Sequence, residues 1–401
     1  MRVGLLFEYP TVNGGENSML AVAAHLSDMQ STDIELHAFA PHAGELARRL
    51  DVIGVDRSQW DMFQDGLRRD RSALIAELSA LTSEFQLDLL HANSLSMGRL
   101  TGAAGSGFPC STSAHLRDIL RLSNAAVRDL NRNSRLIAVS EATRKFHIQQ
   151  GVDSERIVTV HNGIDVDGFA GGALPAGAED APAVRILVRR SVRREFGIPE
   201  DAFVILSVGQ IGLRKGLDIL AEAVVLLAGS MAVTAGHESL QPVHLLLAGA
   251  RFSTKPESIE YEQRVLLRLR EAAPQIVLHP TGYRGDVARL MLAADTLVHA
   301  ARQEPLGRVL IEAGAAGLPI VATSAGGTSE ILEDGRSALL VSVDQPEQLM
   351  HAVNRLRMDP EFRSRMGRLA EKTIRSQFGV DRSAAVLVSH WREICRGKRQ
   401  S

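Results

Sequence analysis

Cysteine is scarce in this sequence, which has 401 residues and only two cysteines, Cys110 and Cys395, far apart along the chain. So few thiols argue against a disulfide framework or a zinc site, and we expect a cytoplasmic, reducing environment. Aromatic residues are also rare, at 4%, which argues against a stacking surface for single-stranded nucleic acid. The formal net charge is only −2, so no nucleic-acid partner is expected and any basic surface must be local.

Long hydrophobic runs are missing as well. A membrane-spanning helix needs about 20 uninterrupted apolar residues, and the most apolar stretch, ILAEAVVLLAGSMAV at 219–233, is interrupted by Glu222. The apolar run at the N-terminus soon meets Glu8, so we expect no signal peptide. With 45% apolar and 23% charged residues, the chain has the composition of an ordinary globular protein.

Short apolar, β-branched runs alternate with helical stretches along the whole chain. Examples are RVGLLFE and DLLHANS in the first half, and FVILSVG and VHLLLAGA in the second. Continuous apolar strands separated by helices are typical of parallel sheets covered on both faces. Two series of about six strands each therefore predict an α/β protein with two doubly wound, Rossmann-like domains.

The expected boundary between these domains is the Gly-, Ala- and Pro-rich stretch Gly171–Ala183, which has no convincing periodicity. We expect a first domain over residues 1–170, a linker leading into the second domain over 171–200, a second domain over 201–376, and a final helix over 377–401. Ligands of such sheets bind beyond the carboxyl ends of the strands. Function is therefore expected in the loops after the strands, on either side of a cleft between facing domains.

A glycine loop follows the first predicted strand of each half. Gly14 and Gly15 precede a helix expected near Glu16, whose N-terminal amides would suit an anion. A plain strand-to-helix turn is the alternative.

In the second half, Gly209 opens a loop that ends in Arg214 and Lys215, just before a helix expected from Gly216. Two cations beside a helix N-terminus favour a diphosphate site over a solvated basic turn. Gly249, after the next strand, is expected near the same anion.

Two further loops carry candidate side chains. Tyr283 and Arg284 follow a strand; the tyrosine either covers a base or packs in the core, and Asp286 is the expected helix N-cap. His115 ends a strand in CSTSAHLRD and is expected to face the cleft, with a purely structural histidine as the alternative.

The spacing of Glu304 and Glu312 predicts a ligand site at the mouth of a helix. Pro305 suits a first helical turn, Gly307 leaves room for a ligand against backbone amides, and Glu312 is expected in the second turn. Because helical side chains lean toward the N-terminus, both carboxylates are expected to point into one space. A carboxylate accepts hydrogen bonds from neighbouring sugar hydroxyls, so the pair is read as a sugar and ribose site.

These motifs together resemble those of the family-four glycosyltransferases, which are retaining enzymes with the GT-B fold. EPLGRVLIEAGAAGLPIVATSAGGTSEI is similar to the family signature, and the resemblance covers nearly the whole chain. Its other parts are NGGEN, SAHLRD, AVSEATR, VHNGIDVDGF, SVGQIGLRKGLD and GYRGDVARLMLAAD.

The resemblance implies an acceptor-binding first domain, a donor-binding second domain, and a C-terminal helix that crosses back to the first. It also implies roles for individual residues. Arg214 and Lys215 would hold the donor diphosphate, Glu312 would bind ribose, and His115 would touch the sugar near the reacting carbon. The residues expected to line the donor site are Gly14, Gly15, Gly209, Arg214, Lys215, Gly249, Tyr283, Arg284, Glu304, Pro305, Leu306, Gly307 and Glu312. Glu304, with the backbone of the three residues after it, would grip the transferred sugar.

Two features of the sequence depart from this picture. Gln210 stands where the family often has an arginine, and Arg214 is expected to supply the missing charge. The Asp165-x-Asp167 pair imitates the metal-binding D-x-D motif of the other large glycosyltransferase fold. The family uses no metal at this segment, so we interpret the pair as structural.

The sequence therefore predicts metal-independent, retaining transfer of a hexose-type sugar from a nucleotide-diphosphate sugar, with no other cofactor, to a carbohydrate or lipid-linked hydroxyl acceptor. The expected process is glycan, cell-surface polysaccharide or glycolipid synthesis. A catalytically silent nucleotide-sugar sensor, or a hydrolase or phosphorylase of the same fold, are the alternatives. The stretch Leu116–Arg135 carries five arginines and two aspartates; it is either a basic amphipathic patch at the inner face of a membrane or a solvated helix face. The nucleotide, the sugar, the acceptor and the oligomeric state stay open.

Overall fold

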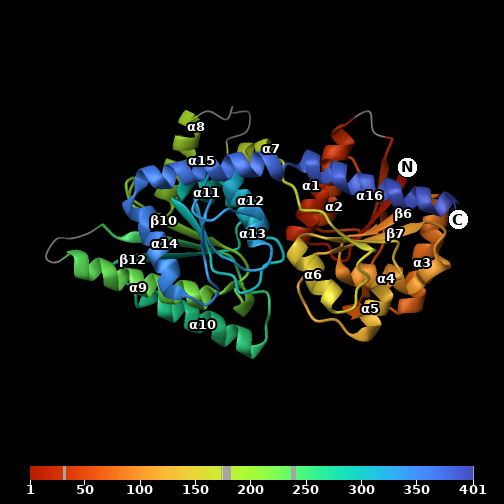
Figure 1. The fold of residues 1–401 in the computed structure, drawn as a ribbon, viewed down its shortest axis with the longest axis horizontal. Coiled ribbons are helices and arrows are strands. Elements are labelled where there is room, and N and C mark those ends of the chain that lie inside the picture. The colour runs from red at the N-terminus through yellow and green to blue at the C-terminus, as the bar shows by residue number, and fades with distance from the viewer. Residues whose placement is uncertain (30–32, 173, 175–181, 236–240, 401) are drawn as a thin grey trace. The chain divides into compact units, whose positions relative to one another are not determined.

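The computed structural model describes residues 1–29, 33–172, 174, 182–235 and 241–400. The chain forms two compact units, Met1–Asp165 with Phe378–Ser401, and Val166–Gln377. Each unit has its own parallel sheet with helices on both faces (Figure 1). The chain passes between the units twice, after Asp165 and after Gln377.

The first unit is built on a seven-stranded parallel sheet with the order β3-β2-β1-β6-β7-β8-β9. Its strands are β1 (Arg2–Leu6), β2 (Glu35–Ala40), β3 (Asp56–Gln59), β6 (Leu89–Ala92), β7 (Ser111–Leu116), β8 (Arg135–Ala138) and β9 (Ile157–Thr159), and β4 (Phe63–Gln64) with β5 (Leu67–Arg68) forms a small antiparallel ribbon. Its helices are α1 (Gly14–Asp28), α2 (Glu45–Val52), α3 (Arg71–Glu84), α4 (Leu95–Ala104), the 3-10 turn η1 (Gly105–Gly107), α5 (Asn124–Leu130), α6 (Glu141–Gln149) and α16 (Val380–Gln400).

The second unit has a six-stranded parallel sheet with the order β12-β11-β10-β13-β14-β15. Its strands are β10 (Val204–Val208), β11 (Val243–Ala248), β12 (Ile276–Gly282), β13 (Thr296–His299), β14 (Ile320–Thr323) and β15 (Leu339–Val341). Its helices are α7 (Val166–Gly171), α8 (Pro182–Glu195), the 3-10 turn η2 (Leu213–Lys215), α9 (Leu217–Ala235), α10 (Pro256–Arg270), α11 (Val287–Ala293), α12 (Arg308–Ala315), α13 (Thr328–Ile331), α14 (Pro346–Met358) and α15 (Pro360–Gln377).

The predicted fold class, two doubly wound parallel-sheet domains, is confirmed. Strands form where the apolar runs predicted them because those runs are buried on both faces; β11, for example, is buried at all six positions. The edge strand β3 was missed because its sequence, DRSQ, is polar and its residues are exposed or only partly buried.

The C-terminal helix belongs to the first unit, as predicted. Helix α16 packs beside α1 (Figure 1), and Leu387 and Trp391 lie in the same apolar cluster as Val3 and Leu5 of the sheet. Of the stretch 171–200 that was predicted as linker, Pro182–Glu195 forms α8. Gly171–Ala183, the expected boundary, lies largely outside the described residues.

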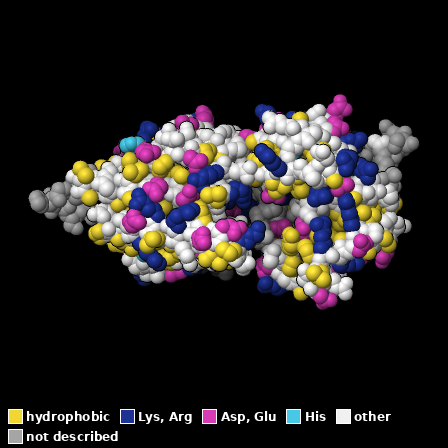
Figure 2. All heavy atoms as spheres, turned by 90° about the horizontal axis from the view of Figure 1, so that it is seen from below, with side chains coloured by type: hydrophobic (Ala, Val, Ile, Leu, Met, Phe, Trp, Pro, Cys, Tyr) yellow, Lys and Arg dark blue, Asp and Glu magenta, His cyan; other side chains and the backbone are white. Residues whose placement is uncertain are grey.

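The basic stretch Leu116–Arg135 is not one amphipathic helix. Only Asn124–Leu130 is helical, and Leu116 and Leu130 are buried in the core. Its arginines therefore do not form one face with all of its leucines. In Figure 2, basic and acidic side chains lie among one another on the visible face. No helix within the described ranges is both long and apolar enough to cross a bilayer.

Candidate active site

Two glycine loops run side by side beyond the carboxyl ends of β10 and β11. The Gly209 amide donates to the Ala248 carbonyl oxygen at 2.9 Å, and the Gly249 amide to the Gly282 carbonyl oxygen at 2.8 Å. Gly209 and Gly249 have φ values of +153° and +152°. A Cβ on Gly249 would lie 1.8 Å from the Gly209 carbonyl oxygen, so no larger residue fits there.

Arg214 and Lys215 follow the first of these loops, in η2, but their side chains differ. Arg214 is exposed, while Lys215 is partly buried and its Nζ lies 2.6 Å from Oε2 of Glu304. The turn ends at Gly216, where φ is +62° and a Cβ would lie 1.9 Å from the Ala300 carbonyl oxygen. Helix α9 then begins at Leu217, one residue later than predicted.

Glu304 is the centre of a buried ionic cluster. Besides Lys215, its Oε2 accepts a hydrogen bond from Nε2 of His299, at 2.8 Å. Burial alone would raise the pKa of Glu304, but the Lys215 charge and the His299 hydrogen bond hold it well below its ordinary value. Burial lowers the pKa of His299, so this carboxylate has one charged and one neutral donor.

Sequence reasoning missed His299 as part of this site. The available signal was its place at the end of a strand, five positions before Glu304, which is the same argument that selected His115.

Glu312 has a separate cationic partner. It lies in the second turn of α12, as predicted, and its Oε1 is 2.7 Å from Nε of Arg308. The expectation that Pro305 lies in the first helical turn is wrong, because α12 begins only at Arg308. Gly307 is the N-cap residue, with a φ of +103°, so the chain turns sharply at Gly307, after Pro305 and Leu306, before it becomes helical.

Tyr283 and Arg284, in the loop after β12, have different surroundings. Tyr283 is 69% exposed, so the alternative that it packs in the core is wrong. Both Nε and Nη2 of Arg284 contact the Asp286 carboxylate, at 2.7 and 2.8 Å, and its Nη1 lies 2.7 Å from Glu195. Asp286 occupies the N-cap position of α11, but its carboxylate binds Arg284 and makes no cap bond. A donor-binding role for Arg284 would have to compete with these two acids.

In the first unit, the Gly14–Gly15 turn starts α1 two residues earlier than predicted. Glu16 has a structural role here, because its Oε2 accepts from the Asn13 amide at 2.9 Å in a capping box. A Cβ on Gly15 would lie 2.8 Å from Cδ of Arg117. Arg117 in turn donates to the side chains of Asn93 and Asn162, both at 2.8 Å. Gly15 therefore lets a fixed cation lie against the N-terminus of α1.

His115 lies near the end of β7 and is only 3% exposed. Its Nδ1 is 2.7 Å from Nε2 of His91, which is on the neighbouring strand β6. Burial, followed by the charge of Arg117, lowers the pKa of His115 well below its ordinary value. The ring is therefore neutral near pH 7 and part of a hydrogen-bond network within the first unit.

Six of the candidate residues thus fall into two sets, one in each unit. Gly209, Lys215, Gly249 and Glu304 come together in the second unit: the loops of Gly209 and Gly249 touch, and a Cβ on Gly209 would lie 3.8 Å from Cε of Lys215. Gly15 and His115 belong to the first unit.

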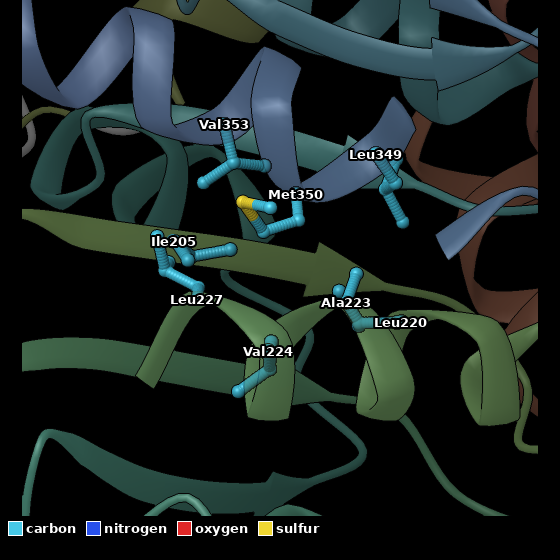
Figure 3. Close-up of a pocket in the computed structure, with 8 residues that line it drawn as sticks. All are labelled: Ile205, Leu220, Ala223, Val224, Leu227, Leu349, Met350 and Val353. Atoms are coloured by element: carbon cyan, nitrogen blue, oxygen red, sulfur yellow. The ribbon is translucent and has the colours of Figure 1, made fainter. Parts of the chain in front are cut away.

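Two other features lie apart from these sets. An apolar gap of ≈ 10 Å³ between β10, α9 and α14 (Figure 3) is lined by aliphatic core residues such as Ile205, Val224 and Val353 and is far too small for a nucleotide sugar. Asp167 of the D-x-D imitation pairs with Arg375 at 2.7 Å. Within the described residues, no cluster of three or more His, Cys, Asp or Glu side chains has the arrangement of a metal site.

Two α/β units of this kind, each with a parallel sheet, and with glycine loops and the carboxylates Glu304 and Glu312 after strands of the second, define the class of GT-B proteins. The Anabaena protein Alr3699/HepE, solved in complex with UDP-glucose, superimposes with a TM-score of 0.78 at 21% identity, covering 98% of this chain and 100% of that one.

The family follows from the sequence matches. Residues 12–167 match the family described as Glycosyltransferase Family 4, and residues 188–373 match Glycosyl transferases group 1. The chain therefore belongs to the glycosyltransferases, with a Family 4 region followed by a group 1 region. It is 31% identical over 258 residues to D-inositol 3-phosphate glycosyltransferase of Streptomyces griseus, covering 64% of this chain and 53% of the relative. The protein of the same name from Streptomyces scabiei is 26% identical over 404 residues, covering 93% of this chain and 84% of the relative. The matched region of this chain spans about half the length of several curated relatives.

Proposed function

We propose that this protein transfers a hexose-type sugar from a nucleotide-diphosphate sugar to a hydroxyl acceptor, with retention of the anomeric configuration and without a metal. The observation that carries this proposal is the buried Lys215–Glu304–His299 cluster beside the adjoining loops of Gly209 and Gly249. A lysine, backbone amides and a fixed carboxylate at strand ends are the groups needed to hold a diphosphate and a sugar.

The cations would act on the leaving group. As the bond between the anomeric carbon and the diphosphate oxygen breaks, negative charge grows on the nucleoside diphosphate. Lys215 and the exposed Arg214 can stabilise that charge, together with loop amides, and Arg214 would replace the positive charge that Gln210 does not provide. In the free protein Lys215 is paired with Glu304, so a bound donor would share or replace that partner.

Glu304 would then orient the transferred sugar by accepting hydrogen bonds from its hydroxyls. We propose a front-face reaction, in which the acceptor oxygen bonds to the anomeric carbon on the face that the diphosphate leaves. The acceptor proton passes to the departing phosphate oxygen, so no protein group has to be the base. The low pKa of Glu304 agrees with this role, because a permanently ionised carboxylate binds hydroxyls but is a poor base.

The donor and acceptor classes are proposed from the relatives. UDP-glucose is bound by the similar Anabaena protein, so UDP-hexoses are the first donors to test, before GDP and ADP sugars. The acceptor is a carbohydrate, cyclitol phosphate or lipid-linked hydroxyl of glycan, cell-surface polysaccharide or glycolipid synthesis.

The test begins with a thermal-shift panel of UDP, GDP and ADP and their hexose derivatives. The stabilising donor is then incubated with and without inositol phosphate, oligosaccharide and lipid-linked acceptors. Product NMR gives the anomeric configuration, and the rate is compared with and without EDTA. Acceptor-dependent product with the donor's configuration, unaffected by EDTA and lost in Lys215→Met, is the expected result.

Each alternative has its own result. Donor binding without any product would favour a nucleotide-sugar sensor. Donor consumption that needs only water or phosphate would favour a hydrolase or phosphorylase. Full turnover in both Lys215→Met and Arg214→Ala would contradict the proposed diphosphate site.

A further inference from the structure

A buried chain of hydrogen-bonding side chains links the C-terminal helix to His115. Trp391 of α16 places its indole Nε1 3.3 Å from Nδ1 of His91, and Nε2 of that histidine is 2.7 Å from Nδ1 of His115. The Ser113 hydroxyl also lies 2.7 Å from Nδ1 of His91. Trp391, His91 and Ser113 have no exposed surface. Helix α16 contacts β7, the strand that carries His115 (Figure 1).

The chemistry of these groups determines which of them donates and which accepts in each hydrogen bond. An indole N–H can only donate, so Nδ1 of His91 must be an unprotonated acceptor. The Ser113 hydroxyl then donates to the same nitrogen, and the two donors share its one in-plane lone pair. The single proton of neutral His91 is therefore on Nε2, and it is donated to Nδ1 of His115.

Both rings are neutral, so each carries a single proton. Burial, followed by the charge of Arg117, lowers the pKa of His91 to about 3. The same two causes act on His115. With its Nδ1 accepting a proton from His91, neutral His115 has its own proton on Nε2.

We infer that Trp391, acting through His91, fixes His115 as the Nε2–H tautomer, so that His115 presents a hydrogen-bond donor and no acceptor to its ligand. The inference deepens the proposed function and rests on it for the identity of that ligand, a sugar hydroxyl oxygen of the donor. His91 and Trp391 are positioning residues, and His115 orients the sugar without removing a proton. The packing of α16 in the first unit would therefore determine which hydrogen-bonding group His115 presents to the sugar.

Trp391 is decisive because it is donor-only. Without it, the Ser113 hydroxyl can either donate to Nδ1 of His91 or accept from it. The proton arrangement could then reverse, which would put the proton of His115 on Nδ1 and leave Nε2 bare. Removal of Ser113 should not have this effect, since the indole N–H stays in place.

The first test reads the tautomer directly. The full-length protein is labelled with ¹⁵N-histidine, and long-range ¹H–¹⁵N correlations are recorded near pH 7, with the His115 signals assigned from their loss in His115→Gln. Wild type and Ser113→Ala should show only the Nε2–H form of His115, whereas Trp391→Phe should show both forms. An Nδ1–H or doubly protonated His115 in wild type would overturn the inference, and so would an unchanged single tautomer in Trp391→Phe.

Trp60→Phe is the matched control. Trp60 is also buried in the first unit, and its indole N–H meets no acceptor among the described residues. This variant should leave tautomer and turnover unchanged. In Trp391→Phe, equal tautomer populations would halve the competent fraction and so lower kcat/KM for the donor about twofold. An equal loss of kcat/KM in Trp60→Phe would overturn the specific role of Trp391.

The last test replaces His115 itself. The amide of glutamine reaches the position of Nε2, whereas that of asparagine reaches only the position of Nδ1. His115→Gln should therefore keep at least tenfold more kcat than His115→Asn; equal activity would overturn the need for a donor at Nε2. The NMR result requires no turnover, so an inactive protein with an Nε2–H His115 would refute the proposed transferase function and leave the tautomer assignment intact.

Discussion

The Lys215–Glu304 pair gives the most quantitative prediction. The Lys215 side chain is 17% exposed and that of Glu304 is 8% exposed, with 2.6 Å between Nζ and Oε2. Lys215→Met leaves a buried carboxylate whose remaining donor, among the residues that the structure describes, is the neutral His299. We therefore expect Lys215→Met to destabilise the second unit more than Glu304→Gln, which leaves a lysine that can reach water.

The size of the free-energy loss follows from protonation, because the buried carboxylate of Glu304 can become neutral by binding a proton once Lys215 is removed. From the ordinary pKa of 4.5, protonation at pH 7 costs about 3 kcal/mol. At pH 5 it costs less than about 1 kcal/mol. The free-energy loss in Lys215→Met should therefore shrink from about 3 kcal/mol at pH 7 to about 1 kcal/mol at pH 5.

The other variants behave differently over this range. The folded-state pKa of Glu304 lies below its unfolded value, so in the wild type its contribution is present above pH 4.5 and is lost only as pH falls through the lower folded value. Glu304→Gln has no carboxyl to titrate, so its cost, about 1 kcal/mol, should be constant between pH 5 and pH 7.

Urea unfolding followed by circular dichroism is the assay, analysed as two transitions because the chain has two units. Both tryptophans, Trp60 and Trp391, belong to the first unit, so their fluorescence follows that unit and serves as the internal control. A loss in Lys215→Met that is equal at pH 5 and pH 7, or smaller at pH 7 than that of Glu304→Gln, would refute the reasoning.

Three further predictions concern the site. Glu312→Ala should weaken nucleotide binding measured by calorimetry, about tenfold in Kd, whereas Glu304→Ala should mainly lower kcat. Gly249→Ala should destabilise the second unit by at least about 2 kcal/mol and abolish nucleotide binding, because its Cβ would meet the Gly209 carbonyl oxygen at 1.8 Å. The pH profile of kcat/KM should show no inflection from His115 between pH 6 and pH 8, since burial holds its pKa well below the ordinary value of 6.5.

Each of these has a clear contrary outcome. Equal losses of nucleotide affinity in the two glutamate variants, with unchanged kcat, would overturn their assignments. Gly229→Ala, on the exposed side of α9 where a Cβ meets nothing within 4 Å, is the control for Gly249→Ala and should be neutral or slightly stabilising. An inflection near pH 6.5 that disappears in His115→Gln would show that His115 titrates during catalysis.

The sequence by itself determined where most strands lie along the chain and which loops carry the candidate functional residues. Apolar runs such as VHLLLA must be buried on both faces, which requires a parallel sheet between helices, and glycines at the ends of such strands mark sharp turns. The place of Glu312 in the second turn of α12 followed from local spacing alone. The polar edge strand Asp56–Gln59 was not predicted, because an edge strand needs no apolar pattern.

Only the tertiary structure decided which side chains are partners. Lys215 and Glu304 are 89 positions apart, and Trp391 and His91 are 300 apart, so no local pattern could pair them. Arg214 and Lys215, adjacent and alike in sequence, differ because one faces solvent and the other a buried carboxylate. Arg284 was read as a ligand-binding cation, yet it is held by Asp286 and Glu195. Local sequence sets the backbone, but charge, tautomer and pKa depend on neighbours that only the folded chain brings within hydrogen-bonding distance.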